Sequence, residues 1–203
     1  LVKISTYRVF FHHRPGSSVR AFALLIVMSC CLIRGASAQA PRPSFAVTPV
    51  ILNNLSALPD TREDSAAIRL LTAEARARLS SCGFPVVADS GEIAGGGGFG
   101  ASYLFEHADV VAQWGARSHA DWVLVSRLNR IGPWVAEWEV QVVSTSAGRA
   151  VDSRVVELKG LSRDSSLTAR LANRGAAWLV DQSLQAVAHA SGASASEKRP
   201  CRA

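Results

Sequence analysis

The stretch ADWVLVSRLNRIGPWVAEWEVQV, residues 120–142, contains the pattern that decides the fold. In its first half, apolar residues occupy both the odd-numbered and the even-numbered positions, so that Trp122 and Val123 fall on opposite faces of a strand. A strand that is buried on both faces is expected in the middle of a sheet that helices cover. After a Gly-Pro turn, apolar and polar residues alternate across residues 134–142, which predicts a half-buried antiparallel strand.

The chain beyond this hairpin predicts one more strand and a long helix. A turn at residues 146–149 is followed by an apolar-rich strand over residues 151–158. Asp164 then occupies the position of a helix N-cap. An apolar stripe runs along the predicted helix: Leu167, Leu171 and Trp178.

The chain before the hairpin predicts two strands and two helices. Residues 45–52 form an apolar first strand, which Pro49 should place at an edge or interrupt with an irregularity. Asp60 stands three residues before Glu63, the spacing of a capping box, and Gly83 can end the helix that starts there.

A short strand at residues 84–88, a glycine-rich loop and a helix at about residues 101–118 complete the elements. Their order is β-α-β-α-β-β-β-α. This order predicts an α/β fold of the α+β-like kind, with a mixed sheet of about five strands and helices packed on it.

Two interpretations are open for Trp134 and Trp138, which share one face of the alternating strand. Paired aromatic side chains can stack on a sugar or a base. Acidic residues alternate with them on the other face, which favours the core for both tryptophans. We expect Trp114 and Trp178, on helical stripes, in the core as well.

The first forty residues have the three parts of a signal peptide. Basic residues extend to Arg20, an uncharged apolar run spans residues 21–33, and small residues lead to Ala40. The apolar run is too short for a hydrocarbon core of about 30 Å. Cleavage is predicted after Ala40, with Ala38 as the other site. An uncleaved anchor and a lipoprotein modified at Cys30 are the alternatives.

The sequence therefore predicts a signal peptide at residues 1–40, a single α/β domain at residues 41–189 and a disordered tail at residues 190–203. We expect the protein in the periplasm or outside the cell. Once the leader is removed, no membrane span is expected.

The charge distribution argues against a nucleic-acid partner. Five of the 22 basic residues precede Pro41, whereas all 16 acidic residues follow it, so the mature chain is almost neutral. Binding to a polyphosphate requires a strong basic footprint. The formal charge of +6 is therefore largely a property of the leader.

The loop at residues 95–100, GGGGFG, contains the spacing GxGxxG through Gly95, Gly97 and Gly100. This spacing between a strand and a helix can bind a nucleotide. A run of glycines also satisfies it by composition alone, and no acidic residue ends the next strand to hold a ribose. A flexible loop is therefore the preferred interpretation.

The sequence contains no recognised catalytic or metal-binding motif. His107, His119 and His189 follow the leader, but none has a partner at a spacing typical of zinc sites or catalytic dyads. No catalytic residue, metal ligand or cofactor is therefore predicted, and replacing any of these histidines with alanine should leave the activity nearly intact.

Cys82 and Cys201 are the two cysteines outside the leader. They can form a disulfide in an oxidising compartment. Alternatively, Cys82 is a buried cysteine at a helix end and Cys201 lies in the tail. Two cysteines fix no spacing pattern, so the sequence leaves both possibilities open.

Several segments resemble a family of small secreted proteobacterial proteins known as a domain of unknown function. They are LSSCGFPVV at 79–87, WG at 114–115, ADWVLV at 120–125, GR at 148–149 and DSSL at 164–167. The order of elements also resembles the amino-terminal domain of TolB and related envelope-assembly domains. Such domains bind other envelope proteins, so the resemblance implies an adaptor.

The preferred hypothesis is a non-catalytic, periplasmic protein-interaction module whose partner is an envelope protein. The alternative is a small-ligand or nucleotide-binding protein that uses residues 95–100. A hydrolase with an unrecognised site is a third option.

Overall fold

The computed structural model describes residues 42–87, 103–161, 164–192 and 201. All of these belong to one compact unit, Arg42–Ala203. The predicted signal peptide with its Ala40 cleavage site and the loop with Gly95, Gly97 and Gly100 lie outside the described residues. So does most of the predicted disordered tail, although Ala190 still belongs to a helix and Cys201 is described.

A five-stranded mixed sheet forms the centre of this unit, as expected. Its strands are β1 (Phe45–Val47), β2 (Ile51–Asn54), β3 (Trp122–Arg130), β4 (Val135–Ser144) and β5 (Arg149–Lys159). β1 and β2 pair one after the other with the same side of β3, in parallel. β3, β4 and β5 form an antiparallel meander, so β5 lies at the outer edge.

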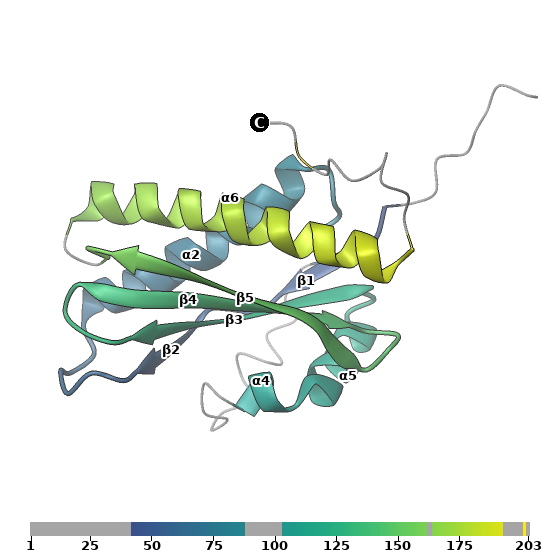
Figure 1. Cartoon of the computed structure of the whole chain (residues 1–203), viewed down its shortest axis with the longest axis horizontal. Helices are drawn as coiled ribbons and strands as arrows, with labels where there is room; N and C mark the ends of the chain where they lie inside the picture. Colours follow the sequence, from purple (N-terminus) through teal and green to yellow (C-terminus); the bar gives the residue numbers. More distant parts are fainter. Residues whose placement is uncertain (1–41, 88–102, 162–163, 193–200, 202–203) are drawn as a thin grey trace, which may run out of the picture. The chain divides into compact units, whose positions relative to one another are not determined.

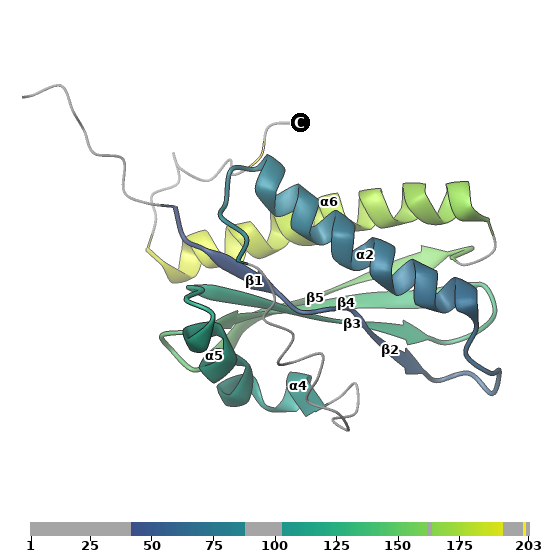
Figure 2. The same ribbon diagram turned by 180° about the vertical axis from the view of Figure 1, so that it is seen from behind.

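Helices cover both faces of the sheet (Figures 1 and 2). Two long helices, α2 (Arg62–Ser81) and α6 (Ser165–Ala190), lie side by side on one face. Two short ones, α4 (Tyr103–Glu106) and α5 (Ala108–Arg117), lie against the other. Each face consequently has its own apolar core, and β3 is buried on both sides, as its sequence predicts.

Pro49 divides the predicted first strand into β1 and β2, which confirms the expected irregularity. At the break, the backbone N–H of Val50 donates to Thr72 Oγ1 on α2 at 2.9 Å. The prediction of a strand at residues 84–88 is wrong for residues 84–87, which the structure describes, because among these only Val86 forms a β-bridge, with Phe45. Pro85 has no N–H, so this segment cannot extend a regular ladder.

The helix ends differ from the predictions in two places. The capping box that begins α2 uses Thr61 and Asp64, one residue later than the predicted pair. The helix expected at residues 101–118 is interrupted at His107, which separates α4 from α5. Asp164 does cap α6, and its carboxylate accepts the N–H of Ser166 at 2.6 Å. Hydrogen bonds from Ser166, and then from the Leu167 backbone, lower the pKa of this carboxyl.

Three of the five tryptophans are buried and two are exposed. Trp138 and Trp114 are 0% and 1% exposed, as expected, and the ring of Trp138 packs against the backbone of Gly175 on α6. The prediction that Trp134 and Trp178 lie in the core is wrong, since the two side chains are 56% and 44% exposed. Trp134 precedes β4, so the alternation of that strand does not determine its orientation.

We predict that Trp138→Ser lowers the free energy of unfolding by about 3–5 kcal/mol, because it removes a large ring from a closed core. The matched variant Trp134→Ser should cost far less, since that ring is largely exposed. Urea unfolding followed by circular dichroism measures both. Equal losses for the two variants would contradict this packing.

Candidate functional site

Four large apolar side chains are exposed at one end of the sheet. Leu55 and Leu58 come from the loop between β2 and α2, and Ile131 and Trp134 come from the turn between β3 and β4. We call these four residues the loop surface. Their exposed fractions are 62%, 47%, 47% and 56%, and they make up four of the six large hydrophobic side chains shown exposed in the described chain.

Strand pairing brings the two loops together. Asn54, at the end of β2, is in register with Arg130, at the end of β3. The next residue, Leu55, donates its N–H to the carbonyl of Arg130 at 2.9 Å. In the turn between β3 and β4, the N–H of Ile131 donates to the carbonyl of Val135 at 3.1 Å. The two loops that carry the loop surface are therefore adjacent at the strand ends.

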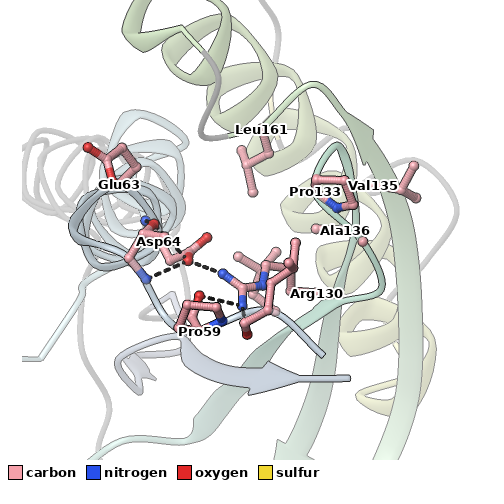
Figure 3. A pocket seen from close by; sticks show the side chains of 12 residues that line it. Pro59, Glu63, Asp64, Arg130, Pro133, Val135, Ala136 and Leu161 are labelled. Carbon is pink, nitrogen blue, oxygen red and sulfur yellow. Dashed lines mark hydrogen bonds and ion pairs between the residues drawn. The ribbon is translucent and has the colours of Figure 1, made fainter. Parts of the chain in front are cut away.

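The guanidinium of Arg130 connects β3 to the loop and to α2 (Figure 3). Its Nη2 donates to the carbonyl oxygens of Leu58 at 2.7 Å and Pro59 at 2.9 Å. Its Nη1 forms an ion pair with Asp64 in the first turn of α2. Arg130 and Asp64 are only 7% and 4% exposed, so this ion pair is buried. Burial and several partners fix the guanidinium in one position.

Asp64 and Asn54 complete the network. The Oδ2 atom of Asp64 accepts from the Thr61 N–H at 2.9 Å and from its hydroxyl at 2.8 Å. The side-chain amide of Asn54 donates to the Leu58 carbonyl and to Asp60 Oδ1, both at 2.7 Å. The polypeptide between β2 and α2 is thus held by side chains at several points along its length.

A cavity of about 360 Å³ opens beside the loop surface. Leu58 lines it from the β2–α2 loop, Pro133 from the β3–β4 turn and Leu161 from the segment after β5, with Asp64 and Arg130 at one wall (Figure 3). Ligand pockets start at about 300 Å³ and are mostly apolar with a few polar groups. The cavity can therefore accept an apolar side chain of a partner.

The histidines lie at three separate places. His107 precedes α5 and stacks on Tyr103 with ring centroids 4.1 Å apart. His119 adopts a φ of 56° in the turn before β3, and His189 lies in the last turn of α6. In the described chain, none of them belongs to a group of three His, Cys, Asp or Glu side chains close enough to share a metal ion.

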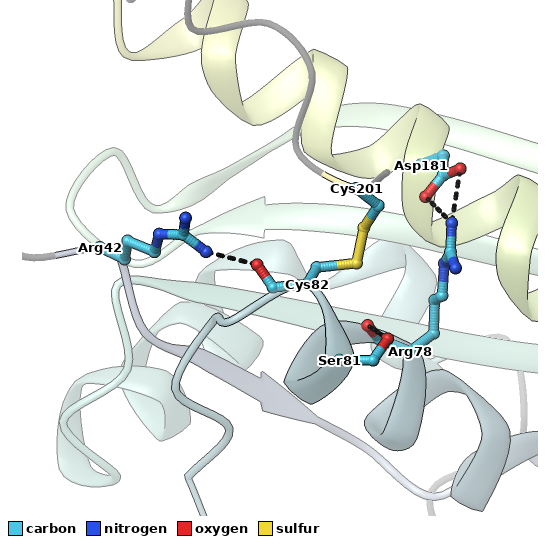
Figure 4. Close-up of a disulfide and its surroundings, with 6 residues drawn as sticks. All are labelled: Arg42, Arg78, Ser81, Cys82, Asp181 and Cys201. Atoms are coloured by element: carbon cyan, nitrogen blue, oxygen red, sulfur yellow. Dashed lines mark hydrogen bonds and ion pairs between the residues drawn. A yellow bond between two sulfur atoms is a disulfide. The ribbon is translucent and has the colours of Figure 1, made fainter. Parts of the chain in front are cut away.

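Cys82, Asp181 and Cys201 form such a group, but the structure joins the two cysteines in a disulfide (Figure 4). Their Cα atoms are 5.0 Å apart, within the usual range for a disulfide. Asp181 pairs with Arg78 at 3.0 Å. The bridge attaches residue 201 to the end of α2, and sulfur atoms joined in a disulfide are not thiolate ligands. The oxidation state of the exported protein stays a prediction.

The sequence did not indicate the loop surface, because its pattern assigned Trp134 to the core and carried no signal for the exposed Leu55 and Leu58. The Gly132–Pro133 turn was the available signal, since a residue directly after such a turn need not follow the strand's alternation. Nothing in the local sequence indicates the ion pair of Arg130 with Asp64, whose members are 66 residues apart.

No family model and no curated protein matches this chain. Among solved structures, lipoprotein GNA1162 from Neisseria meningitidis is similar over 68% of this chain and 96% of its own, with 18% identity and a TM-score of 0.46. The C-terminal domain of LpoB from Escherichia coli is similar over 65% of this chain and 93% of its own, with 15% identity and a TM-score of 0.41.

TolB from Acinetobacter baumannii is similar over 75% of this chain and 30% of its own, with 15% identity and a TM-score of 0.42. TolB, which the expected resemblance named, is thus among the solved structures that are similar to this chain. The expected membership of a family of unknown function is not supported, since no family model matches. In the described part of the chain, no helix has the length and apolar character needed to span a membrane.

We predict that Arg130→Met lowers the free energy of unfolding by about 3–5 kcal/mol, because it leaves the Asp64 carboxylate buried without its counter-charge. Lys159→Met is the matched control. Lys159 pairs with Glu157 at 3.4 Å, but both side chains are exposed, so its loss should cost at most about 1 kcal/mol. Denaturant unfolding decides the question, and a loss for Arg130→Met as small as that of the control would contradict a structural role for the ion pair.

We also predict that the exported protein contains no free thiol at Cys82 or Cys201. The disulfide closes a loop with a sequence separation of 119 residues, for which the chain-entropy model gives a stabilisation of about 5 kcal/mol. Alkylation under denaturing conditions followed by mass spectrometry counts the thiols. The double variant Cys82→Ser/Cys201→Ser should then unfold at lower temperature. Two alkylated cysteines in the exported protein would overturn the pairing.

Proposed function

We propose that this chain is a non-catalytic protein-interaction module of the cell envelope, which binds another envelope protein through the loop surface. The observation that carries the proposal is the concentration of exposed apolar side chains there. Contiguous apolar patches on soluble domains mark interaction sites, and exposed tryptophan is typical of the residues that contribute most to binding. Trp134 is the side chain that we expect to contribute most.

The geometry favours binding by a surface that is already formed. The hydrogen bonds of Arg130 to the carbonyls of Leu58 and Pro59 fix the loop that carries half of the loop surface. A partner then does not have to order this loop, so less of the binding energy is lost as entropy. The adjoining cavity offers room for one anchoring side chain of the partner.

The envelope location is supported by the predicted leader, whose basic, apolar and small-residue parts precede the folded unit. The nearly neutral mature chain favours a protein partner over a polyphosphate. The nucleotide-binding alternative depends on residues 95–100, which lie outside the described residues, and no described residue favours it.

We predict that a photo-crosslinking amino acid at Ile131 captures one envelope protein in intact cells, and that Trp134→Ser in the same chain abolishes this product. Both positions are exposed, so the fold should be kept. Ala147 is the control position, because it is exposed in the β4–β5 turn at the opposite end of the sheet.

An Ile131 product that survives Trp134→Ser, or an equal product from Ala147, would contradict binding by the loop surface. A melting temperature that rises with a nucleotide, together with no specific crosslink, would favour the small-ligand alternative instead.

A further inference from the structure

We propose that the outer edge of β5 pairs with β5 of a second copy of this chain, antiparallel, about a two-fold axis that passes through Ser153. This inference goes beyond the proposed function and concerns a different surface. It unites the two five-stranded sheets into one continuous sheet.

The edge is long and unpaired in the described chain. β5 has 11 residues, more than any other strand, and it pairs with β4 alone. Its outer side therefore presents backbone N–H and C=O groups that another strand can pair with. Natural proteins protect such edges with charged residues, so the charges on β5 decide which strand fits it.

When two copies of β5 lie antiparallel, their charged side chains are complementary. A two-fold axis through Ser153 places Asp152 of each copy opposite Arg154 of the other, which forms two cross-strand pairs of opposite charge. Within one chain, Arg154 and Asp152 already lie 2.7 Å apart at this edge. An axis through Arg154 would place the two Arg154 side chains opposite each other. The charges thus select one register and disfavour the next.

An apolar flank lies above the same edge. Leu167 on α6 packs over Gly160, at the end of β5, and Gly175 packs over Trp138, whose strand partner is Val156. α6 therefore runs back along β5, and it carries the half-exposed Trp178 one turn beyond Gly175. The axis keeps both α6 helices on one face of the joined sheet.

Cysteine trapping of the purified, full-length mature chain tests the register. Because Ser153 faces its own copy across the axis, Ser153→Cys should give a covalent dimer under mild oxidation with copper phenanthroline. Val155→Cys is the matched control on the same strand and face, and it should stay monomeric because its own copy lies several residues away. A failure of Ser153→Cys to crosslink, or equal crosslinking of Val155→Cys, overturns the proposed pairing.

Charge exchange tests the interaction independently. Asp152→Arg and Arg154→Asp should each weaken the dimer by at least about tenfold in analytical ultracentrifugation, because each creates two pairs of like charge. An equimolar mixture of the two variants should form a heterodimer, although the pair within each chain stays broken. Single variants that dimerise like the wild type, or a mixture that stays monomeric, contradict the proposal. The Ile131 crosslink tests the other surface, so the two proposals can fail separately.

Discussion

The buried ion pair between Arg130 and Asp64 is the interaction on which the rest of the loop surface depends. It joins the last residue of β3 to the first turn of α2, and the same guanidinium holds two carbonyl groups of the intervening loop. A buried charge pair of this kind is a weak source of net stability, because both charges lose their hydration. Its effect here is positional, since breaking it would leave a buried charge that only a moved loop could solvate.

The strands β3 and β4 support the loops at their ends, and these loops carry the side chains that we propose for binding. β3 is buried on both faces, and β4 buries one face in the core beneath α6, so the two strands form a rigid support. The apolar side chains that we propose for binding lie on loops at the ends of these strands, where the backbone does not belong to a β-strand. Binding residues commonly occur on loops that a rigid scaffold positions. The β5 edge is a second surface, whose charges favour one partner strand over others.

Much of the fold could be predicted from the sequence, because its signals are local. Apolar residues on both parities of β3 predicted a central strand, Pro49 predicted the break between β1 and β2, and Asp164 predicted the start of α6. The candidate site could not be predicted, since it depends on a charge pair between residues far apart in the chain. Trp134 was misplaced for a related reason: the alternation of β4 was extended one residue too far into the turn.

Amide hydrogen exchange of residues 41–203, alone and with the protein captured at Ile131, tests the central claim most directly. The account predicts slower exchange at residues 55–61 and 131–135 in the complex, while the helices α4 and α5 exchange as in the chain alone. It also predicts that the Thr61 amide is already protected in the chain alone, because its N–H donates to the buried Asp64 carboxylate. Protection confined to α4 and α5, or no change at residues 55–61 and 131–135, would contradict it.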